Sequence, residues 1–127
     1  MIDLSSVHDQ QMFRETFRLA KTRVRALVER EPGFYPMFTE NGKWCHDLPP
    51  WTYWCDGFLP GMMWIFAAAE TDAEAASWWH DQAVHYTKPL EPRKFDGDVH
   101  DLRLIFMSTF YRWHEITGET ALRDVLV

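Results

Sequence analysis

Basic residues and cysteines are both scarce in this sequence. Lys and Arg total 13 against 19 Asp and Glu, which gives a formal net charge of −6. Proteins that bind nucleic acid need a basic surface to neutralise phosphates, so this charge argues against a nucleic-acid partner. The two cysteines, Cys45 and Cys55, form no metal or redox motif. We expect free thiols in a reducing cytosol, with a disulfide between them as the alternative.

Long apolar runs are missing as well. The longest, at about 58–69, is too short to span the roughly 30 Å of a bilayer. The N-terminus, MIDLSSVHDQ, lacks the basic and apolar regions of a signal peptide, so we predict a cytoplasmic protein without a membrane partner. His80 and His85 are five residues apart and no HExxH motif is present, so neither a metal site nor a cofactor is predicted.

The alternation of apolar and polar residues that is typical of strands is absent, and the apolar residues recur at helical spacing instead. We therefore predict an all-α domain over residues 1–127. The predicted helices occupy about 6–31, 60–70, 73–87, 98–117 and 119–126. The second is apolar on every side, which predicts burial on every side. The first carries a ladder of basic residues, which we interpret as a solvated face rather than an anion-binding one.

Between the first two predicted helices lies an irregular stretch, 34–58. Several prolines and Asn41-Gly42 exclude a long element there, and Asn-Gly predicts a turn. An irregular loop of about 25 residues is uncommon in a compact domain and is usually functional. Because this one is rich in aromatic residues, we expect it to pack down as a lid or rim.

A repeat with a shift of 46 residues relates Thr71 to Thr117. At both places a helix, a short turn and a second helix are predicted, which fits stacked αα-hairpins in an (α/α) toroid or a solenoid. The same shift relates His100 and Asp101 to Trp54 and its neighbour, each just before a buried helix. Equivalent places lie along one rim, and helix N-termini favour anionic ligands.

The chain contains about two and a half such hairpins, whereas stacked repeats usually need at least three. Its last helix ends on apolar residues without a polar cap. We expect that this end is covered by self-association, or that the chain is the N-terminal portion of a longer protein.

Two motifs then identify a family. The run WCDGFLPGMMW at 54–64 resembles the W-x-x-G-F-x-x-G-M-x-W signature of glycoside hydrolase family 88, the unsaturated glucuronyl hydrolases. The run VHDL at 99–102, with Phe106, resembles the H-D-x-G-F motif of that family. The turns at 70–72 and 115–118 resemble the ELTGD turns of the family, and the resemblance covers roughly residue 51 to the end.

The resemblance implies an (α/α)6 barrel, of which this chain would form the first two and a half hairpins. It also implies an oligosaccharide substrate that ends in a Δ4,5-unsaturated uronic acid. Water adds across the vinyl ether double bond, and the resulting hemiketal collapses to release the sugar. By motif position Asp101 matches an assisting catalytic aspartate, His100 its neighbour, and Trp54 the ring that stacks on the sugar.

The departures from the family pattern limit the expected activity. The principal acid/base aspartate of the family has no counterpart in this sequence, and Arg103 replaces the glycine of H-D-x-G-F. We therefore predict that the chain alone is inactive, and a helical-repeat binding module or a non-functional truncation product remain alternatives. Three of these residues also have a structural interpretation: Asp101 as the N3 residue of a helix capped by Asp98, Trp54 as a core ring, and Asp56 as a cap for the second predicted helix. The functional alternative for Asp56 is a general base paired with Asp101.

Overall fold

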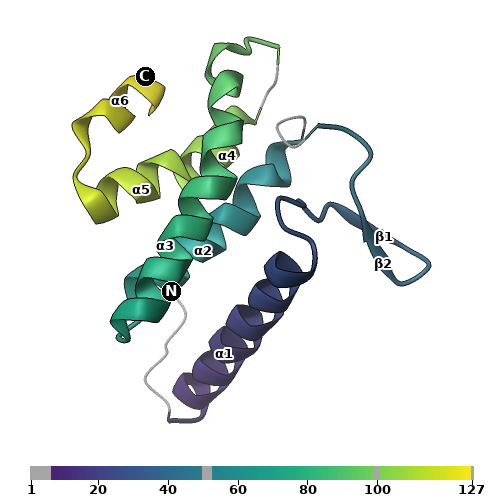
Figure 1. The fold of residues 1–127 in the computed structure, drawn as a ribbon, viewed down its shortest axis with the longest axis vertical. Coiled ribbons are helices and arrows are strands. Elements are labelled where there is room, and N and C mark those ends of the chain that lie inside the picture. Colours follow the sequence, from purple (N-terminus) through teal and green to yellow (C-terminus); the bar gives the residue numbers. More distant parts are fainter. Residues whose placement is uncertain (1–6, 50–52, 99–100, 127) are drawn as a thin grey trace. The chain divides into compact units, whose positions relative to one another are not determined.

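The computed structural model describes residues 7–49, 53–98 and 101–126. The chain divides into two compact units, residues 1–32 and 33–127. The first unit contains one long helix, and the second contains a small hairpin and the remaining helices (Figure 1). One of the predicted site residues, His100, lies outside the described residues.

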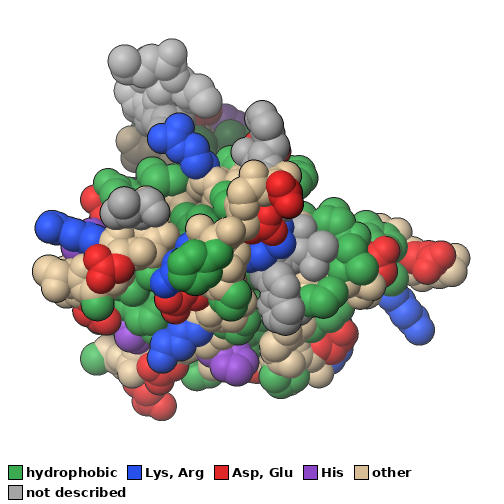
Figure 2. Space-filling model, turned by 90° about the horizontal axis from the view of Figure 1, so that it is seen from above, with side chains coloured by type: hydrophobic (Ala, Val, Ile, Leu, Met, Phe, Trp, Pro, Cys, Tyr) green, Lys and Arg blue, Asp and Glu red, His purple; other side chains and the backbone are tan. Residues whose placement is uncertain are grey.

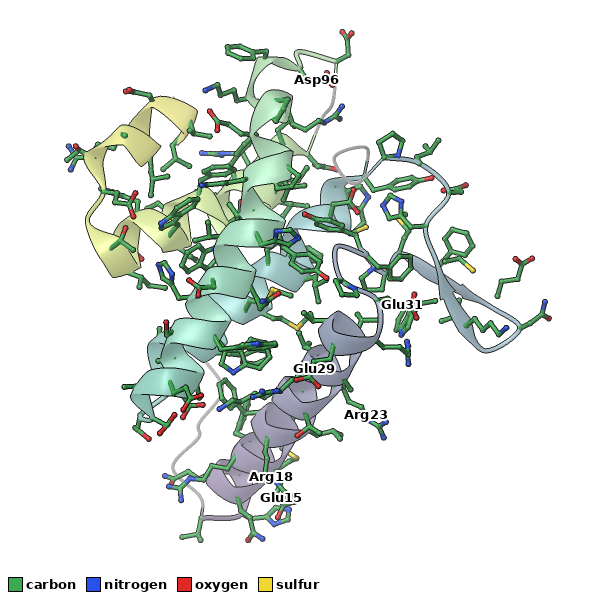
Figure 3. The ribbon with its side chains drawn as sticks, viewed as in Figure 1. Glu15, Arg18, Arg23, Glu29, Glu31 and Asp96 are labelled. Carbon is green, nitrogen blue, oxygen red and sulfur yellow. The ribbon has the colours of Figure 1, made fainter. Side chains whose placement is uncertain are left out.

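Helix α1 spans Val7–Arg30, which confirms the prediction of a long first helix. Both acidic and basic side chains occur along it, among them Glu15, Arg18 and Glu29, which Figure 3 labels. The Arg25 Nε donates to Glu29 Oε1 at 2.8 Å, one turn further on. Pairs at this spacing stabilise a helix slightly, which agrees with the interpretation of a solvated charged face. The chain leaves the helix through Pro32 and Gly33.

The second unit begins with a β-hairpin, so the prediction of no sheet was wrong. Strands β1 (Phe38–Glu40) and β2 (Lys43–Cys45) pair antiparallel, with Phe38 opposite Cys45. The turn predicted at Asn41-Gly42 is confirmed, and both residues have positive φ, of 50° and 75°. That is the backbone of a two-residue hairpin turn, for which Asn-Gly is preferred. Strands of three residues are too short to show alternation in the sequence, which is why they were missed.

A helical hairpin follows. The 3-10 turn η1 (Trp54–Gly57) leads into α2 (Phe58–Ala69), and α3 (Ala73–Thr87) packs against α2. The Asp72 carboxylate caps α3 by accepting from the Ala75 N–H at 2.8 Å. Helix α3 has the predicted bounds, whereas the prediction that α2 is buried all round was wrong. Exposed side chains on α2 include those of Phe58, Met62 and Ile65.

The chain then continues through the 3-10 segment η2 (Lys88–Phe95) to α4 (Leu102–Ser108) and α5 (Phe110–Thr117). One helix was predicted over 98–117, but it breaks at Thr109, where ψ is −82°. The Thr109 hydroxyl donates to the Ile105 carbonyl at 2.7 Å. Such a bond to the previous turn competes with the helix ladder and often bends a helix.

The C-terminal segment forms a second helix–turn–helix. Gly118 ends α5 with φ 73°, a left-handed conformation that glycine adopts without strain. The short elements η3 (Thr120–Leu122) and α6 (Arg123–Leu126) complete it. The helix, turn and helix predicted around Thr71 and Thr117 are therefore both present. The described chain is mostly helical, as predicted.

The core of this unit is built from aromatic rings on α2, α3 and α5. The Trp64 indole stacks on Trp113, with ring centroids 5.3 Å apart, and its N–H donates to the Thr87 hydroxyl at 3.0 Å. The side chains of five more residues are also almost fully buried: Trp79, Tyr86, Leu90, Ile105 and Phe110. Buried indoles contribute strongly when the N–H is satisfied, so this cluster holds α2, α3 and α5 together.

Candidate functional site

Two glycines bring α2 and α4 into backbone contact. A Cβ on Gly57 would lie 2.7 Å from the Cα of Ile105, and one on Gly61 would lie 3.0 Å from the carbonyl oxygen of Ser108. Only glycine allows so close an approach. Because the contacts advance in the same direction along both segments, the η1–α2 segment and α4 run in the same sense.

The two predicted site motifs therefore lie toward the same end of this pair. Trp54 precedes Gly57 by three residues, and Asp101 precedes Ile105 by four. Given the Gly57–Ile105 contact, chain geometry keeps the Cα atoms of Trp54 and Asp101 within roughly 20 Å of each other. We call this end, with Trp54, Phe58 and Asp101, the rim.

Asp101 is the residue that immediately precedes α4, and its side chain makes no capping hydrogen bond to that helix. Its carbonyl oxygen accepts from the Leu104 N–H at 3.0 Å. The structural interpretation, with Asp98 as the cap and Asp101 at N3, was wrong. The Asp98 N–H instead donates to the Asp96 carboxylate at 2.9 Å. Asp96 is labelled in Figure 3, at the end of η2.

Trp54 is not a core ring. Its side chain is 45% exposed, and it packs edge-on against Phe58, which is 42% exposed, with centroids 5.6 Å apart. Trp54 and Phe58 are thus two partly exposed rings packed against each other at the start of α2. Arg103, which replaces a glycine of the family motif, is exposed. On the face shown in Figure 2, basic side chains are scattered among acidic and apolar ones.

Asp56, which lies between Trp54 and Phe58 in the sequence, is buried. Its Oδ1 lies 3.0 Å from His46 Nε2, and its Oδ2 accepts from the Tyr53 N–H at 3.2 Å. The second bond closes the turn η1, so the predicted capping role holds for η1 rather than for α2. His46 was missed, because ten residues separate it from Asp56 and neither residue lies in a recognisable motif.

Burial raises the pKa of Asp56, while the hydrogen bonds from His46 and the Tyr53 N–H, and the charge of Arg93, lower it. The raising effect dominates, because a carboxylate removed from water loses much of its hydration. Tyr53 also donates to Asp47 Oδ1 at 2.7 Å, and this bond raises the pKa of the Tyr53 phenol. The chain on either side of residues 48–52 is thus joined twice, by Asp47 to Tyr53 and by His46 to Asp56.

A separate apolar groove of about 320 Å³ lies between α2 and α5. It contains none of the predicted site residues. It is lined by Trp64, Ile65, Ala68, Ala69, Arg112, Glu115 and Ile116. Among the described residues, no three His, Cys, Asp or Glu side chains are grouped so that they could hold a metal ion. Within 7–49, 53–98 and 101–126, no helix combines the length and apolarity needed to cross a bilayer.

Comparison of the chain with protein-family models, with curated proteins and with solved structures gave no match.

Proposed function

We propose that the rim binds the end of an oligosaccharide that carries a Δ4,5-unsaturated uronic acid, as in the unsaturated glucuronyl hydrolases that the two motifs resemble. The observation that carries this proposal is the contact of Gly57 with Ile105. It limits how far the start of η1 can lie from the start of α4, and these starts bear the two motifs. In an (α/α) barrel, which remains a prediction, both starts would open on one mouth.

In this proposal Trp54 is the stacking residue. A sugar ring presents a flat face of C–H groups, and an exposed indole offers a rigid apolar surface of matching size. Phe58 packs edge-on against Trp54 and limits its motion. Asp101 supplies a carboxyl group next to the sugar, and His100 is its neighbour by motif position.

The reaction of the family adds water across the vinyl ether double bond, after which the hemiketal collapses and releases the sugar. A carboxylic acid suits the proton transfers of such a hydration when its pKa is matched to the task. By motif position Asp101 is the assisting group. No residue of the sequence matches the principal acid/base aspartate, so we expect binding of the unsaturated sugar without turnover.

The test is a titration with an unsaturated uronyl disaccharide, followed through the indole N–H signals in two-dimensional ¹H–¹⁵N NMR spectra. We expect the Trp54 signal to shift on binding, and Trp54→Ala to abolish binding. Trp44→Ala is the matched control, because Trp44 lies on β2 and is 49% exposed, close to the value for Trp54.

Asp101→Asn should weaken binding while leaving the fold intact, whereas a binding module without sugar chemistry would be indifferent to both substitutions. Equal loss in the Trp44 and Trp54 variants would contradict the proposal. Loss of the ultraviolet absorbance of the unsaturated sugar would show turnover, and would contradict the expectation of an inactive chain.

A further inference from the structure

The contact between His46 and Asp56 joins two segments that the sequence keeps apart. His46 follows β2 directly, and Asp56 lies in the turn η1. The side chain of His46 is 6% exposed and that of Asp56 is fully buried. A buried carboxylate needs hydrogen-bond partners, and losing one leaves a costly unsatisfied charge. The contact is therefore a specific link between the hairpin segment and η1.

Both oxygens of Asp56 are engaged, and each has a distinct role. Oδ2 accepts from the Tyr53 N–H and closes η1 on itself, while Oδ1 meets His46 and attaches the closed turn to the residue after β2. The His46 ring also meets the Tyr53 ring edge-on, with centroids 5.3 Å apart. One oxygen of Asp56 thus bonds within the turn, to Tyr53, and the other bonds to His46, outside the turn.

Trp54 lies within this turn, two residues before Asp56. A 3-10 turn of four residues is short, and its direction is set by the contacts that hold it. The groups that face the Asp56 carboxylate and interact with it are His46 and Tyr53, together with Tyr35, Cys55 and Arg93. Of these, His46 is the side chain from the segment after β2 that bonds to the carboxylate directly.

We propose that His46 is a positioning residue for the sugar-stacking ring of Trp54 and acts through Asp56. This inference depends on the proposed function for its ligand, but its structural part concerns the orientation of Trp54 alone. The bond that orients the turn is formed by the Nε2 atom of the imidazole. A side chain that places a donor nitrogen at that position should keep the ring in place, and one that does not should release it.

The experiment compares His46→Gln with His46→Asn. The amide nitrogen of Gln can reach the position of Nε2, whereas that of Asn is one methylene shorter and cannot. Both substitutions are polar and uncharged, so they differ chiefly in whether the bond to Asp56 Oδ1 can form. His46→Leu is a third variant, which keeps the volume and removes the donor.

Two measurements are made on each variant. The first is the indole N–H signal of Trp54 without ligand, with the buried Trp64 signal as the internal check on the fold. The second is the affinity for the unsaturated disaccharide. We expect His46→Gln to resemble the wild type in both. We expect His46→Asn and His46→Leu to move the Trp54 signal, leave that of Trp64 in place, and bind about tenfold more weakly.

The outcomes separate this inference from the proposed function. If the wild-type chain binds the sugar and His46→Asn binds equally well with an unmoved Trp54 signal, the role of His46 is refuted and the proposed function stands. If the wild-type chain does not bind the sugar, the proposed function fails, and the ligand-free signals still decide whether His46 orients Trp54. A loss of the Trp64 signal in His46→Asn and in His46→Gln alike would show a purely structural role and overturn the inference.

Discussion

Trp54 and Trp64 are ten residues apart in one aromatic stretch, yet they occupy opposite environments. Trp64 is completely buried, stacked on Trp113, with its N–H bonded to Thr87. Trp54 is nearly half exposed and meets only the edge of Phe58 among the rings described. The two indoles are alike in chemistry, so the difference arises from what surrounds them.

This difference indicates how a core and the proposed binding rim can be built from one short segment. The interior ring is surrounded by partners from α3 and α5, and its donor is satisfied, which is the condition for burying an indole at little cost. The outer ring is held by a turn whose anchor is a buried carboxylate and a histidine. Stability should depend on the first ring, and ligand binding on the second.

The largest expected effect on stability comes from removing the buried indole of Trp64. Trp64→Ala should lower the free energy of unfolding by about 3–5 kcal/mol, because it leaves a large cavity among closely packed rings. Trp54→Ala should change it by less than about 1 kcal/mol, since its ring is half in water already. Urea denaturation followed by far-ultraviolet circular dichroism measures both. Equal losses in the two variants would contradict the division into core and rim.

An intermediate effect is expected from the glycine that joins the rim to α4. Gly57→Ala would place a Cβ 2.7 Å from the backbone of Ile105, and backbone cannot move aside as a flexible side chain can. We expect a loss of about 1–3 kcal/mol in the free energy of unfolding, together with a shifted Trp54 indole signal.

The control for this substitution is Gly97→Ala. A Cβ on Gly97 meets nothing within 4 Å, and its backbone has no positive φ. It should therefore leave both the stability and the Trp54 signal close to those of the wild type. If the two glycine variants behaved alike, the close approach of α2 and α4 would have no energetic role.

The smallest expected effect is a pH dependence of stability that comes from Asp56, in the turn that holds Trp54. Burial raises the pKa of Asp56 in the folded protein, so the folded state holds this proton more tightly than the unfolded chain does. The contribution of Asp56 to stability is then present below the ordinary pKa of the carboxyl group and is lost as the pH rises through the raised value. Asp56→Asn cannot titrate, and its amide can still bond to both Tyr53 and His46.

We therefore expect the stability of the wild type relative to Asp56→Asn to fall as the pH rises through that window. Urea denaturation at a series of pH values measures it, with the exposed acid Glu74→Gln as the control. A relative stability that rises with pH would mean that the bonds from His46 and Tyr53 outweigh burial.

Local patterns in the sequence predicted correctly those elements whose structure is fixed by residues close together in the chain. The bounds of α3 follow from the Asp72 cap and its apolar spacing, and the turn at Asn41-Gly42 follows from two residues that tolerate positive φ. The repeat of helix, turn and helix was visible for the same reason. Strands β1 and β2 were missed because three residues cannot display a period of two.

Other features depended on contacts across the chain. At the break at Thr109, the hydroxyl bonds to a carbonyl of the previous turn. The sequence around Thr109 does not show whether this bond forms. The pairing of His46 with Asp56 crosses ten residues of irregular chain, so no spacing rule could identify it. Helix α4 starts at Leu102 and not near residue 98, and the Asp98 N–H donates to the Asp96 carboxylate.

By itself the sequence determined that the chain is mostly helical, where its turns fall, and that Trp54 and Asp101 stand before related helices. These properties are encoded in residues that are close along the chain, through periodicity, capping and turn chemistry. Only the tertiary structure decided which indole is buried, how closely α2 approaches α4, and which carboxylate is buried against His46. Each of these depends on atoms far apart in sequence, whose meeting is governed by packing and desolvation rather than by local preference.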